Sequence, residues 1–299
     1  MGIETKFIRQ NGEYIPWEDS MQHTVSHALH YGTSVFEGIR FYDTENGPKI
    51  FRLYDHIVRL FHSAKVTDME VNFTIQEIVD ACKNLIQKNN LKSGYIRPIF
   101  YYGYGKMGLD PKGAKLECVI SSWNWGKYLS DEAIKVFVSS YIRPHPKSIE
   151  ITAKVGGYYV NSMLSHRESS KKGYDEALLL DYEGYIAEGP GENIFFIKDN
   201  VLYTPALGSI LPGFTRDTIM TICEENLGII TLQEKILPED LADFDEAFFV
   251  GTAAEVTPIC EINDADGNIY EFDNSVTNNI KELYSQLVTG KLGHNERLF

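Results

Sequence analysis

Four short segments in the second half of the chain carry residue types that could do chemistry. Lys154 lies in the apolar, glycine-flanked segment 153–159. A lysine in such a context is easily desolvated and can then attack a carbonyl group as a nucleophile. Glu188 ends a predicted strand before a Gly/Pro-rich turn, and the segments 211–216 and 251–255 are built around small residues. Taken singly, Lys154 and Glu188 are each more readily explained as solvated surface side chains.

The segment Leu211-Pro-Gly-Phe-Thr215 comes directly before a helical pattern that starts near Arg216. Free backbone N–H groups at a helix N-terminus, together with the Thr215 hydroxyl, form a natural phosphate-binding site. A plain threonine N-cap explains the same residues equally well. The small-residue turn 251–254 follows the predicted strand 246–250, so its backbone could approach a ligand closely or could simply be a tight connection.

A reactive lysine, a phosphate site and a carboxylate together fit pyridoxal phosphate better than any other cofactor. In that interpretation Lys154 forms a Schiff base with the cofactor, and the helix N-terminus near Thr215 holds the phosphate. The Glu188 carboxylate keeps the ring nitrogen protonated.

The elements that must position these residues are predicted from periodicity and turn signals. In the second half these are strands at 134–140, 176–182, 184–188, 193–197, 201–204, 246–250 and 258–263, and helices at 157–172, 216–227 and 275–290. The first half is predicted to contain a hairpin around Asn46-Gly47, a helix at 55–66 and strands at 95–102 and 117–123. A second helix there is opened by the capping box of Thr74 and Glu77.

The chain has 299 residues, too many for one small core, and both halves mix strands with helices. The fold class is therefore predicted to be mixed α/β (α+β) with two domains rather than a regular βαβ repeat. We predict a small N-terminal α/β domain over 1–124, an interdomain loop over 125–133 and a large C-terminal domain over 134–299. The cofactor is expected to bind to the large domain.

Charge is spread unevenly along the chain. The net charge is −14, with +1 in residues 1–150 and −15 in residues 151–299. Such an acidic protein is a poor partner for nucleic acid or an anionic membrane surface. The four cysteines are far apart and match no metal or CxxC spacing, and the first ten residues have no apolar core. We expect a cytoplasmic protein with free thiols and no metal.

Two other patterns suggest sites only by their spelling. Residues 103–108 read GxGxxG, but Leu109-Asp110-Pro111 follows, so no helix opens there to receive a dinucleotide phosphate. His23, His27 and His30 could share a helix face and bind a metal. Their continuation through Gly32 to Gly38 argues against a stable helix, so we expect them to be structural histidines.

The sequence resembles the branched-chain amino acid aminotransferases, which are pyridoxal phosphate enzymes of fold-type IV. The match runs from about residue 8 to residue 290. Three motifs carry it: Ser26-His-Ala-Leu-His-Tyr-Gly-Thr-Ser-Val-Phe-Glu-Gly-Ile-Arg40, Tyr95-Ile-Arg-Pro98 and Gly251-Thr-Ala-Ala-Glu-Val-Thr-Pro258. The resemblance implies a fold like that of D-amino acid aminotransferase.

The resemblance also implies roles for single residues. Lys154 matches the Schiff-base lysine and general acid/base, and Glu188 matches the partner of the pyridinium nitrogen. Tyr159 matches the tyrosine that hydrogen-bonds the ring oxygen, and Arg59 matches the phosphate-binding arginine. The remaining cofactor contacts are expected from Leu211, Phe214, Thr215 and Thr252. Phe214 stands where the family often has Ile, which matters little if its backbone N–H is the donor.

The substrate pocket is likewise implied by the resemblance. Its expected residues are Tyr31, Phe36, Arg40, Tyr95, Arg97, Met107, Leu109, Trp125, Tyr128, Thr252 and Ala253. Arg97, with Tyr31 and Tyr128, is expected to receive the side-chain carboxylate of glutamate. The turn at Thr252-Ala253 is expected to receive the α-carboxylate.

The implied reaction is transamination between the branched-chain L-amino acids and 2-oxoglutarate, with Lys154 moving the proton. The partners would be amino acids, 2-oxo acids and further copies of the chain, in a homodimer or a dimer-built hexamer. Alternatives within the same fold type are a D-amino acid aminotransferase, an R-selective amine transaminase and an aminodeoxychorismate lyase. A non-enzymatic binding protein of the same fold is a further alternative.

Overall fold

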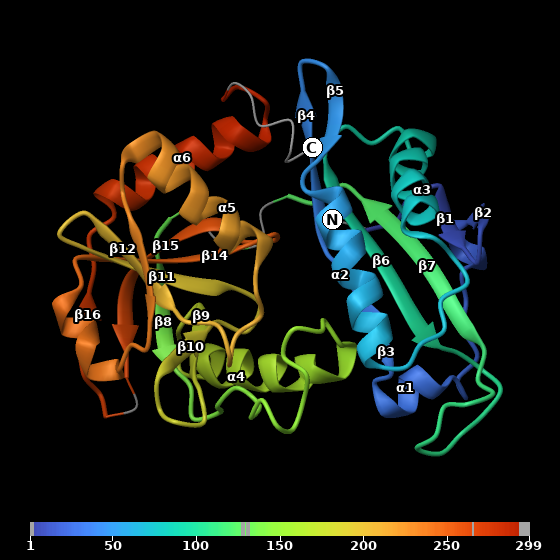
Figure 1. Cartoon of the computed structure of the whole chain (residues 1–299), viewed down its shortest axis with the longest axis horizontal. Helices are drawn as coiled ribbons and strands as arrows, with labels where there is room; N and C mark the ends of the chain where they lie inside the picture. The colour runs from blue at the N-terminus through green and yellow to red at the C-terminus, as the bar shows by residue number, and fades with distance from the viewer. Residues whose placement is uncertain (1–2, 127–128, 130–131, 265, 293–299) are drawn as a thin grey trace. The chain divides into compact units, whose positions relative to one another are not determined.

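The computed structural model describes residues 3–126, 129, 132–264 and 266–292. These residues form two compact units (Figure 1). The first unit comprises residues 3–126, 153–158 and 288–292, and the second comprises the described residues of 127–152 and 159–287. The predicted domain bounds stay a prediction. The units are not continuous in sequence, because residues 153–158 pack with the first unit. Residues 127, 128, 130 and 131 of the predicted interdomain loop lie outside the described part of the chain.

The first unit is built on an antiparallel sheet in the order β2-β1-β7-β6-β4-β5, with β3 also paired to β6. Its strands are β1 (Phe7–Gln10), β2 (Glu13–Pro16), β3 (Ser34–Phe36), β4 (Ile39–Thr44), β5 (Gly47–Ile50), β6 (Gly94–Tyr102) and β7 (Leu116–Trp123). Its helices are α1 (His27–Tyr31), α2 (Leu53–Val66) and α3 (Ile75–Lys88), with 3-10 turns at Trp17–Asp19 and Gly156–Tyr158.

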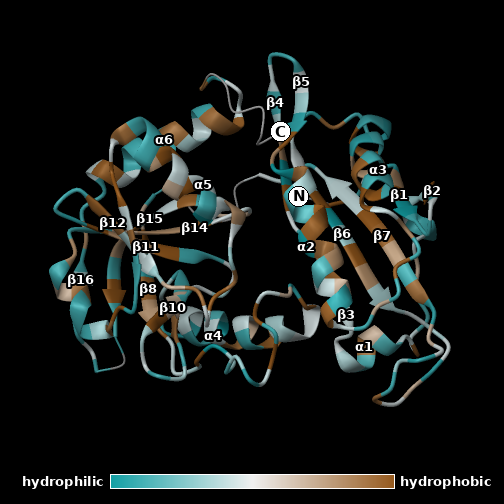
Figure 2. Ribbon diagram, in the orientation of Figure 1, coloured by the Kyte–Doolittle hydropathy of each residue, from teal (hydrophilic) through white to brown (hydrophobic). Residues whose placement is uncertain are grey.

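Helices α2 and α3 pack on this sheet because each has one apolar face. The capping box that opens α3 is confirmed: the Thr74 N–H donates to Glu77 Oε2 at 2.7 Å, and the Glu77 N–H donates to Thr74 Oγ1 at 3.2 Å. The buried apolar residues of α3 join Ile57 and Leu60 of α2 in one core; they are Ile78, Val79, Cys82, Leu85 and Ile86. Figure 2 shows brown and teal alternating around α2, as expected for an amphipathic helix.

The second unit contains a mixed sheet in the order β10-β9-β8-β15-β14-β11-β12-β13, with β16 on β15. Parallel pairs join β8 to β9 and β15, and β12 to β13, while the other pairs are antiparallel. Its strands are β8 (Ile134–Val138), β9 (Glu176–Leu180), β10 (Ile186–Glu188), β11 (Asn193–Lys198), β12 (Val201–Pro205), β13 (Thr231–Glu234), β14 (Glu246–Gly251), β15 (Glu255–Asn263) and β16 (Ile269–Glu271).

The helices of the second unit are α4 (Tyr159–Lys171), α5 (Phe214–Ile222) and α6 (Ser275–Val288). A π-helical turn at Cys223–Leu227 continues α5, and a 3-10 segment covers Pro238–Asp243. The helix predicted at 216–227 therefore begins two residues earlier, because Gly213 and not Thr215 is the N-cap. Within the described residues, no helix is both long and apolar enough to cross a bilayer.

The structure changes two of the local predictions. A short helix, α1, does form at the histidine motif. Gly32 follows it and ends it in a left-handed conformation with φ of 67°. Two of the histidines contact neighbouring protein groups: His27 Nδ1 lies 2.8 Å from Thr33 Oγ1, and His30 Nε2 lies 3.0 Å from the Thr24 carbonyl. Strands β1, β2, β3 and β13, each of three or four residues, were not predicted.

The structure also describes the surroundings of the GxGxxG segment and of the four cysteines. No helix follows the GxGxxG segment at 103–108. All four cysteines are free. Among the described residues there is no group of histidines, cysteines and carboxylates that could hold a metal.

Candidate active-site residues in the two units

In the first unit, helix α2 presents a polar face within an otherwise apolar helix. His56, Arg59 and Ser63 are spaced by three and four residues, so their side chains lie above one another on one side of the helix. All three are buried. A buried polar group must be hydrogen-bonded, so this face must meet polar partners.

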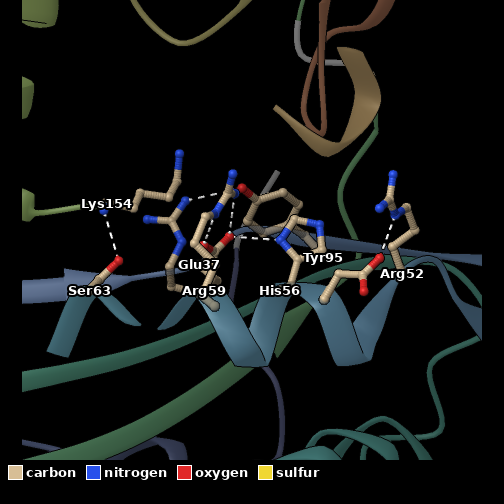
Figure 3. Close-up of polar contacts among 9 residues, drawn as sticks. Glu37, Arg52, His56, Arg59, Ser63, Tyr95 and Lys154 are labelled. Carbon is tan, nitrogen blue, oxygen red and sulfur yellow. Dashed lines mark hydrogen bonds and ion pairs between the residues drawn. The ribbon is translucent and has the colours of Figure 1, made fainter. Parts of the chain in front are cut away.

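Glu37 is the main partner of this face. It is fully buried and accepts two hydrogen bonds from the Arg59 guanidinium, from Nε to Oε1 at 2.6 Å and from Nη2 to Oε2 at 2.9 Å. His56 Nδ1 lies 2.7 Å from the same Oε2 (Figure 3). Burial opposes ionisation of Glu37, but the charge of Arg59 and the hydrogen bonds from Arg59 and His56 outweigh it and lower the pKa of the carboxyl group. Glu37 therefore holds Arg59 as a charged, bidentate pair.

The His56 ring completes this network as a neutral group. Burial lowers the pKa of its imidazole, and the charges of Arg59 and Lys154 lower it further. The Glu37 carboxylate has the opposite effect, but does not outweigh them. At neutral pH the ring is then uncharged, and its Nδ1–H donates a hydrogen bond to Glu37.

Lys154 lies beside the same helix face. Its backbone N–H donates to Ser63 Oγ at 2.9 Å, and its carbonyl accepts from the Phe36 N–H at 3.1 Å. Ser63 and Arg59 are one turn apart on α2, so the helix brings the predicted lysine and the predicted phosphate-binding arginine together (Figure 3). The Lys154 Nζ atom lies 5.3 Å from the centre of the Phe36 ring, and the side chain is half-buried.

The predicted pocket residues of the first unit form a ladder of arginines and aromatic rings. The Arg97 guanidinium lies 4.6 Å from the Phe36 ring and 5.3 Å from the Tyr95 ring. The ring centres of Tyr95 and Trp125 are 4.5 Å apart, with the two rings nearly perpendicular. The Arg40 guanidinium carbon lies 5.9 Å from the centre of the same Trp125 ring. Arg97 Nε is buried without a hydrogen-bond partner in the described part of the chain.

Gly38 explains why the Phe36-Glu37-Gly38 motif needs a glycine. A Cβ atom at this position would overlap the Tyr95 hydroxyl oxygen. The absence of a side chain lets Tyr95 lie directly against β4, where its hydroxyl accepts from Arg97 Nη2 at 3.4 Å. Two predicted substrate residues thus depend on the small size of Gly38.

Three other predicted pocket residues form a separate, exposed group. The Gly108 N–H donates to the Tyr31 hydroxyl at 3.3 Å, which ties α1 to the segment around Met107. Leu109 is 90% exposed, and Tyr31 and Met107 are about two-fifths exposed. Tyr128, also predicted for the pocket, lies outside the described residues.

In the second unit, Glu188 is directed inward by a β-bulge. The register between β10 and β9 shifts between Ile186 and Glu188, and such a shift turns a side chain to a new direction. Its carboxylate is almost fully buried and accepts from Arg143 Nη2 at 2.7 Å and from Asn193 Nδ2 at 3.0 Å. The Leu211 N–H donates to both carboxylate oxygens at 3.2–3.3 Å.

The predicted phosphate site coincides with the N-terminus of α5. Gly213 is the N-cap, and a glycine has no side chain that could cap the first N–H groups of the helix. The explanation of Thr215 as an N-cap is wrong, since it is the second helical residue and is buried. A helix N-terminus of this kind attracts anions.

The last predicted contacts lie at element ends. Thr252 and Ala253 belong to the three-residue turn between β14 and β15, where Gly251 pairs with Glu255. The interpretation as a tight connection is confirmed, and a ligand contact at this turn stays a prediction. Tyr159 is the first residue of α4.

A second buried acid, Glu192, was not predicted. Burial raises the pKa of its carboxyl group, and the charges of Glu176 and Glu188 add to this effect. Its Oε2 atom accepts from the Gly191 N–H at 2.9 Å. Glu176 is paired instead with His166, 2.8 Å away. Burial and these neighbouring charges therefore favour the protonated form of Glu192.

Comparison with known proteins identifies the family. Residues 34–262 match the family model described as Amino-transferase class IV. The chain belongs to the class IV aminotransferases. It is 45% identical over 290 residues to a branched-chain-amino-acid aminotransferase of Pseudomonas aeruginosa, covering 95% of this chain and 93% of the relative. The corresponding Escherichia coli K12 enzyme is 43% identical over 294 residues, covering 95% and 94% of the two chains.

Solved class IV aminotransferase structures have the same fold. The Escherichia coli branched-chain amino acid aminotransferase superposes with a TM-score of 0.93 at 42% identity, over 98% of both chains. The T.th. branched-chain amino acid aminotransferase, complexed with N-(5'-phosphopyridoxyl)-L-glutamate, gives a TM-score of 0.91 at 41% identity over 97% of this chain and 96% of that one. The predicted resemblance and the mixed α/β fold class are confirmed.

The sequence analysis missed several residues around these sites: Glu37, His56, Ser63, Arg143 and Asn193. A signal existed for His56 and Ser63, because polar residues at helical spacing from Arg59 predict a buried polar face. Glu37 lies inside the most diagnostic motif. Arg143 had no local signal, since its partner Glu188 is 45 positions away in the sequence.

Proposed function

We propose that this class IV aminotransferase transfers amino groups between branched-chain L-amino acids and 2-oxoglutarate, with pyridoxal phosphate as cofactor. The 43–45% identity to branched-chain aminotransferases along nearly the whole chain is the observation that carries the proposal. The cofactor supplies an electron sink that stabilises negative charge on the substrate α-carbon.

The residues of each unit fit this cofactor. A buried carboxylate that already has three donors, Glu188, suits a protonated ring nitrogen because it stays ionised and fixed in place. The glycine-capped N-terminus of α5 suits a phosphate. We propose that Lys154, Arg59, Tyr159, Glu188, Leu211, Phe214, Thr215 and Thr252 bind the cofactor.

We propose Lys154 as the residue that carries the proton. Its backbone is fixed by Ser63 and Phe36, so the flexible side chain swings from a fixed base. Nζ would take the proton from the substrate α-carbon and deliver it to the cofactor, acting first as base and then as acid. Arg59, whose guanidinium is held by Glu37 through Nε and Nη2, would supply positive charge to the phosphate.

The ladder of Phe36, Arg97, Tyr95, Trp125 and Arg40 supports a pocket for two kinds of side chain. Its rings offer an apolar surface for a branched side chain, and the buried Arg97 Nε offers a donor to the second carboxylate of glutamate. An apolar pocket without such a donor would have to desolvate that charge at a cost of several kcal/mol.

We further propose that Tyr31, Met107 and Leu109 enter the pocket of a neighbouring copy, in a homodimer or a dimer-built hexamer. Their exposure on the single chain supports this, since a leucine that is 90% exposed leaves nearly all of its apolar surface open to a partner. Tyr128, Thr252 and Ala253 complete the proposed substrate contacts. Four free thiols are consistent with a cytoplasmic enzyme.

Two experiments test this function. Borohydride reduction of the purified protein with pyridoxal phosphate should fix the cofactor to Lys154, as located by peptide mass mapping, and Lys154→Ala should not be labelled. Turnover with 2-oxoglutarate should be fast for L-leucine, L-isoleucine and L-valine, and slow for D-alanine and R-1-phenylethylamine. Fast turnover of D-alanine without L-leucine would instead identify a D-amino acid aminotransferase.

A further inference from the structure

Asn193 occupies a rigid position in the second unit. It is the first residue of β11 and pairs with Val250 on the neighbouring strand β14. The side chain is almost fully buried. A polar amide at such a place costs free energy unless its donors and acceptor find partners.

Both partners of the amide nitrogen are groups of the candidate site. Asn193 Nδ2 donates to Glu188 Oε2 at 3.0 Å and to the Leu211 carbonyl at 3.0 Å, which uses the two N–H bonds of an amide nitrogen. The Leu211 N–H returns to the Glu188 carboxylate. These three residues therefore close a ring of hydrogen bonds.

The amide oxygen contacts the start of helix α5. A Cβ atom added to Gly213 would overlap Asn193 Oδ1, so the glycine leaves room for this oxygen. The φ of Gly213 is −74°, which any residue can adopt, so space and not backbone conformation calls for glycine here. The same amide thus touches the carboxylate, the turn and the helix N-cap.

We propose that Asn193 is a positioning residue that fixes the distance between Glu188 and the phosphate-binding turn 211–215. This rests on the proposed function, in which Glu188 meets the ring nitrogen and the turn meets the phosphate. The ring nitrogen and the phosphate belong to one rigid cofactor, so its two partners must be held at one spacing. An amide that bonds both partners sets that spacing before the cofactor binds.

Asn193→Asp is the sharpest perturbation because it keeps the shape and removes the donor. The new carboxylate would face Glu188 and the Leu211 carbonyl, which both repel it. Other titratable groups near Glu188 in the described part of the chain include Arg143, which contacts it, and Arg216 and Glu192, which interact with it electrostatically. On acidification the introduced carboxylate would take up a proton and with it regain one donor.

The measurement is the dissociation constant of pyridoxal phosphate, titrated by absorbance from pH 5.5 to 8.5. The variants are Asn193→Asp and Asn193→Ala, with Asn268→Asp as matched control. Asn268 also donates its amide to a carboxylate, Asp264 at 2.8 Å, but at the turn between β15 and β16. Thermal unfolding of each apoenzyme shows whether the variant is folded.

We expect the dissociation constant to rise about 10- to 100-fold in Asn193→Asp at pH 8, and no less than in Asn193→Ala. The Asn193→Asp affinity, relative to wild type, should recover toward pH 5.5, whereas Asn193→Ala should not. Asn268→Asp should stay within about 2-fold of wild type. A role in shape alone predicts the reverse order, with Asp harmless and Ala harmful.

A second variant keeps the test valid if Asn193→Asp does not fold. Gly213→Ala should weaken cofactor binding in the wild-type background by displacing the Asn193 oxygen. The same change should have a smaller effect in Asn193→Ala, where the overlap is gone, so the two changes should not be additive.

Full cofactor affinity in Asn193→Asp, or strict additivity with Gly213→Ala, overturns the inference alone. A wild-type protein that binds no pyridoxal phosphate overturns the proposed function and this inference together.

Discussion

The buried pair of Glu37 and Arg59 yields a quantitative prediction. Glu37→Gln keeps the size of the side chain but removes the charge that compensates Arg59, which is 9% exposed. Breaking a buried ion pair on one side leaves an uncompensated charge and typically costs about 3–5 kcal/mol. Glu37 accepts three hydrogen bonds of 2.6–2.9 Å, so we expect a loss of that size in the free energy of unfolding.

The same helix provides a control that isolates burial. The Arg52 Nε to Asp55 Oδ2 distance is also 2.6 Å, but the Asp55 side chain is 38% exposed. Exposed pairs contribute about 0–1 kcal/mol, so Asp55→Asn should change the unfolding free energy by no more than this. Cofactor affinity should fall about 10- to 100-fold in Glu37→Gln and remain unchanged in Asp55→Asn.

Urea unfolding of the apoenzyme measures both changes. The double variant Glu37→Gln/Arg59→Met should regain most of the stability lost in either single variant, because no charge is then left buried alone. The pKa of Glu37 is lowered in the folded protein, so its stabilisation is complete above the ordinary glutamate pKa of about 4.3 and is lost as the pH falls further. Additive losses in the double variant, or equal losses in Glu37→Gln and Asp55→Asn, would refute the reasoning.

Three further predictions follow from contacts elsewhere in the two units. Because burial raises the pKa of Glu192, its proton stabilises the fold below the unfolded pKa of about 4.3, and this stabilisation is lost as the pH rises toward about 8. The free energy of unfolding of Glu192→Gln, measured with urea, should therefore rise relative to wild type across that range, by at most about 1.4 kcal/mol per pH unit. A difference between the two proteins that does not change with pH would contradict this. Arg97→Met should raise the KM for 2-oxoglutarate about 10- to 100-fold and change the single-turnover rate with L-leucine little, and equal losses for both substrates would exclude a selective role. Gly38→Ala should lower the unfolding free energy by about 1–3 kcal/mol through overlap with the Tyr95 hydroxyl and ring, and adding Tyr95→Phe should restore part of it in the same urea assay, since the ring Cζ would still lie 2.6 Å from the new Cβ. A Tyr95→Phe change that gives no recovery would place the strain elsewhere.

Periodic and capped elements were predictable because their signals are local. The Thr74–Glu77 capping box and the hairpin at Asn46-Gly47 are encoded within a few residues, and both form as expected. The bulge that turns Glu188 inward depends on how β10 pairs with β9, which is a tertiary property. The sequence therefore identified the carboxylate but not its partners.

The candidate site likewise combines features that the local sequence predicts with features that depend on tertiary contacts. Lys154 and Glu188 were identifiable by residue type, context and family motif. That Lys154 packs on α2 beside Arg59 was not, because a hydrogen bond to Ser63 spans 91 positions in the sequence. The buried polar network around Glu37 follows from a helix face that becomes polar only where it meets β3 and β4.

The path of the chain through its two units has a consequence for dissecting the protein. The chain passes from one unit to the other after residues 126, 152, 158 and 287, and the short second visit to the first unit delivers Lys154. A single proteolytic cut or gene truncation cannot release a first unit that still contains its lysine. A fragment ending at residue 126 would lack the strand-like segment whose Val155 bridges to Val35, leaving an apolar patch of its core open to water. Such a fragment should aggregate, because the first unit needs residues 153–158 to complete its core.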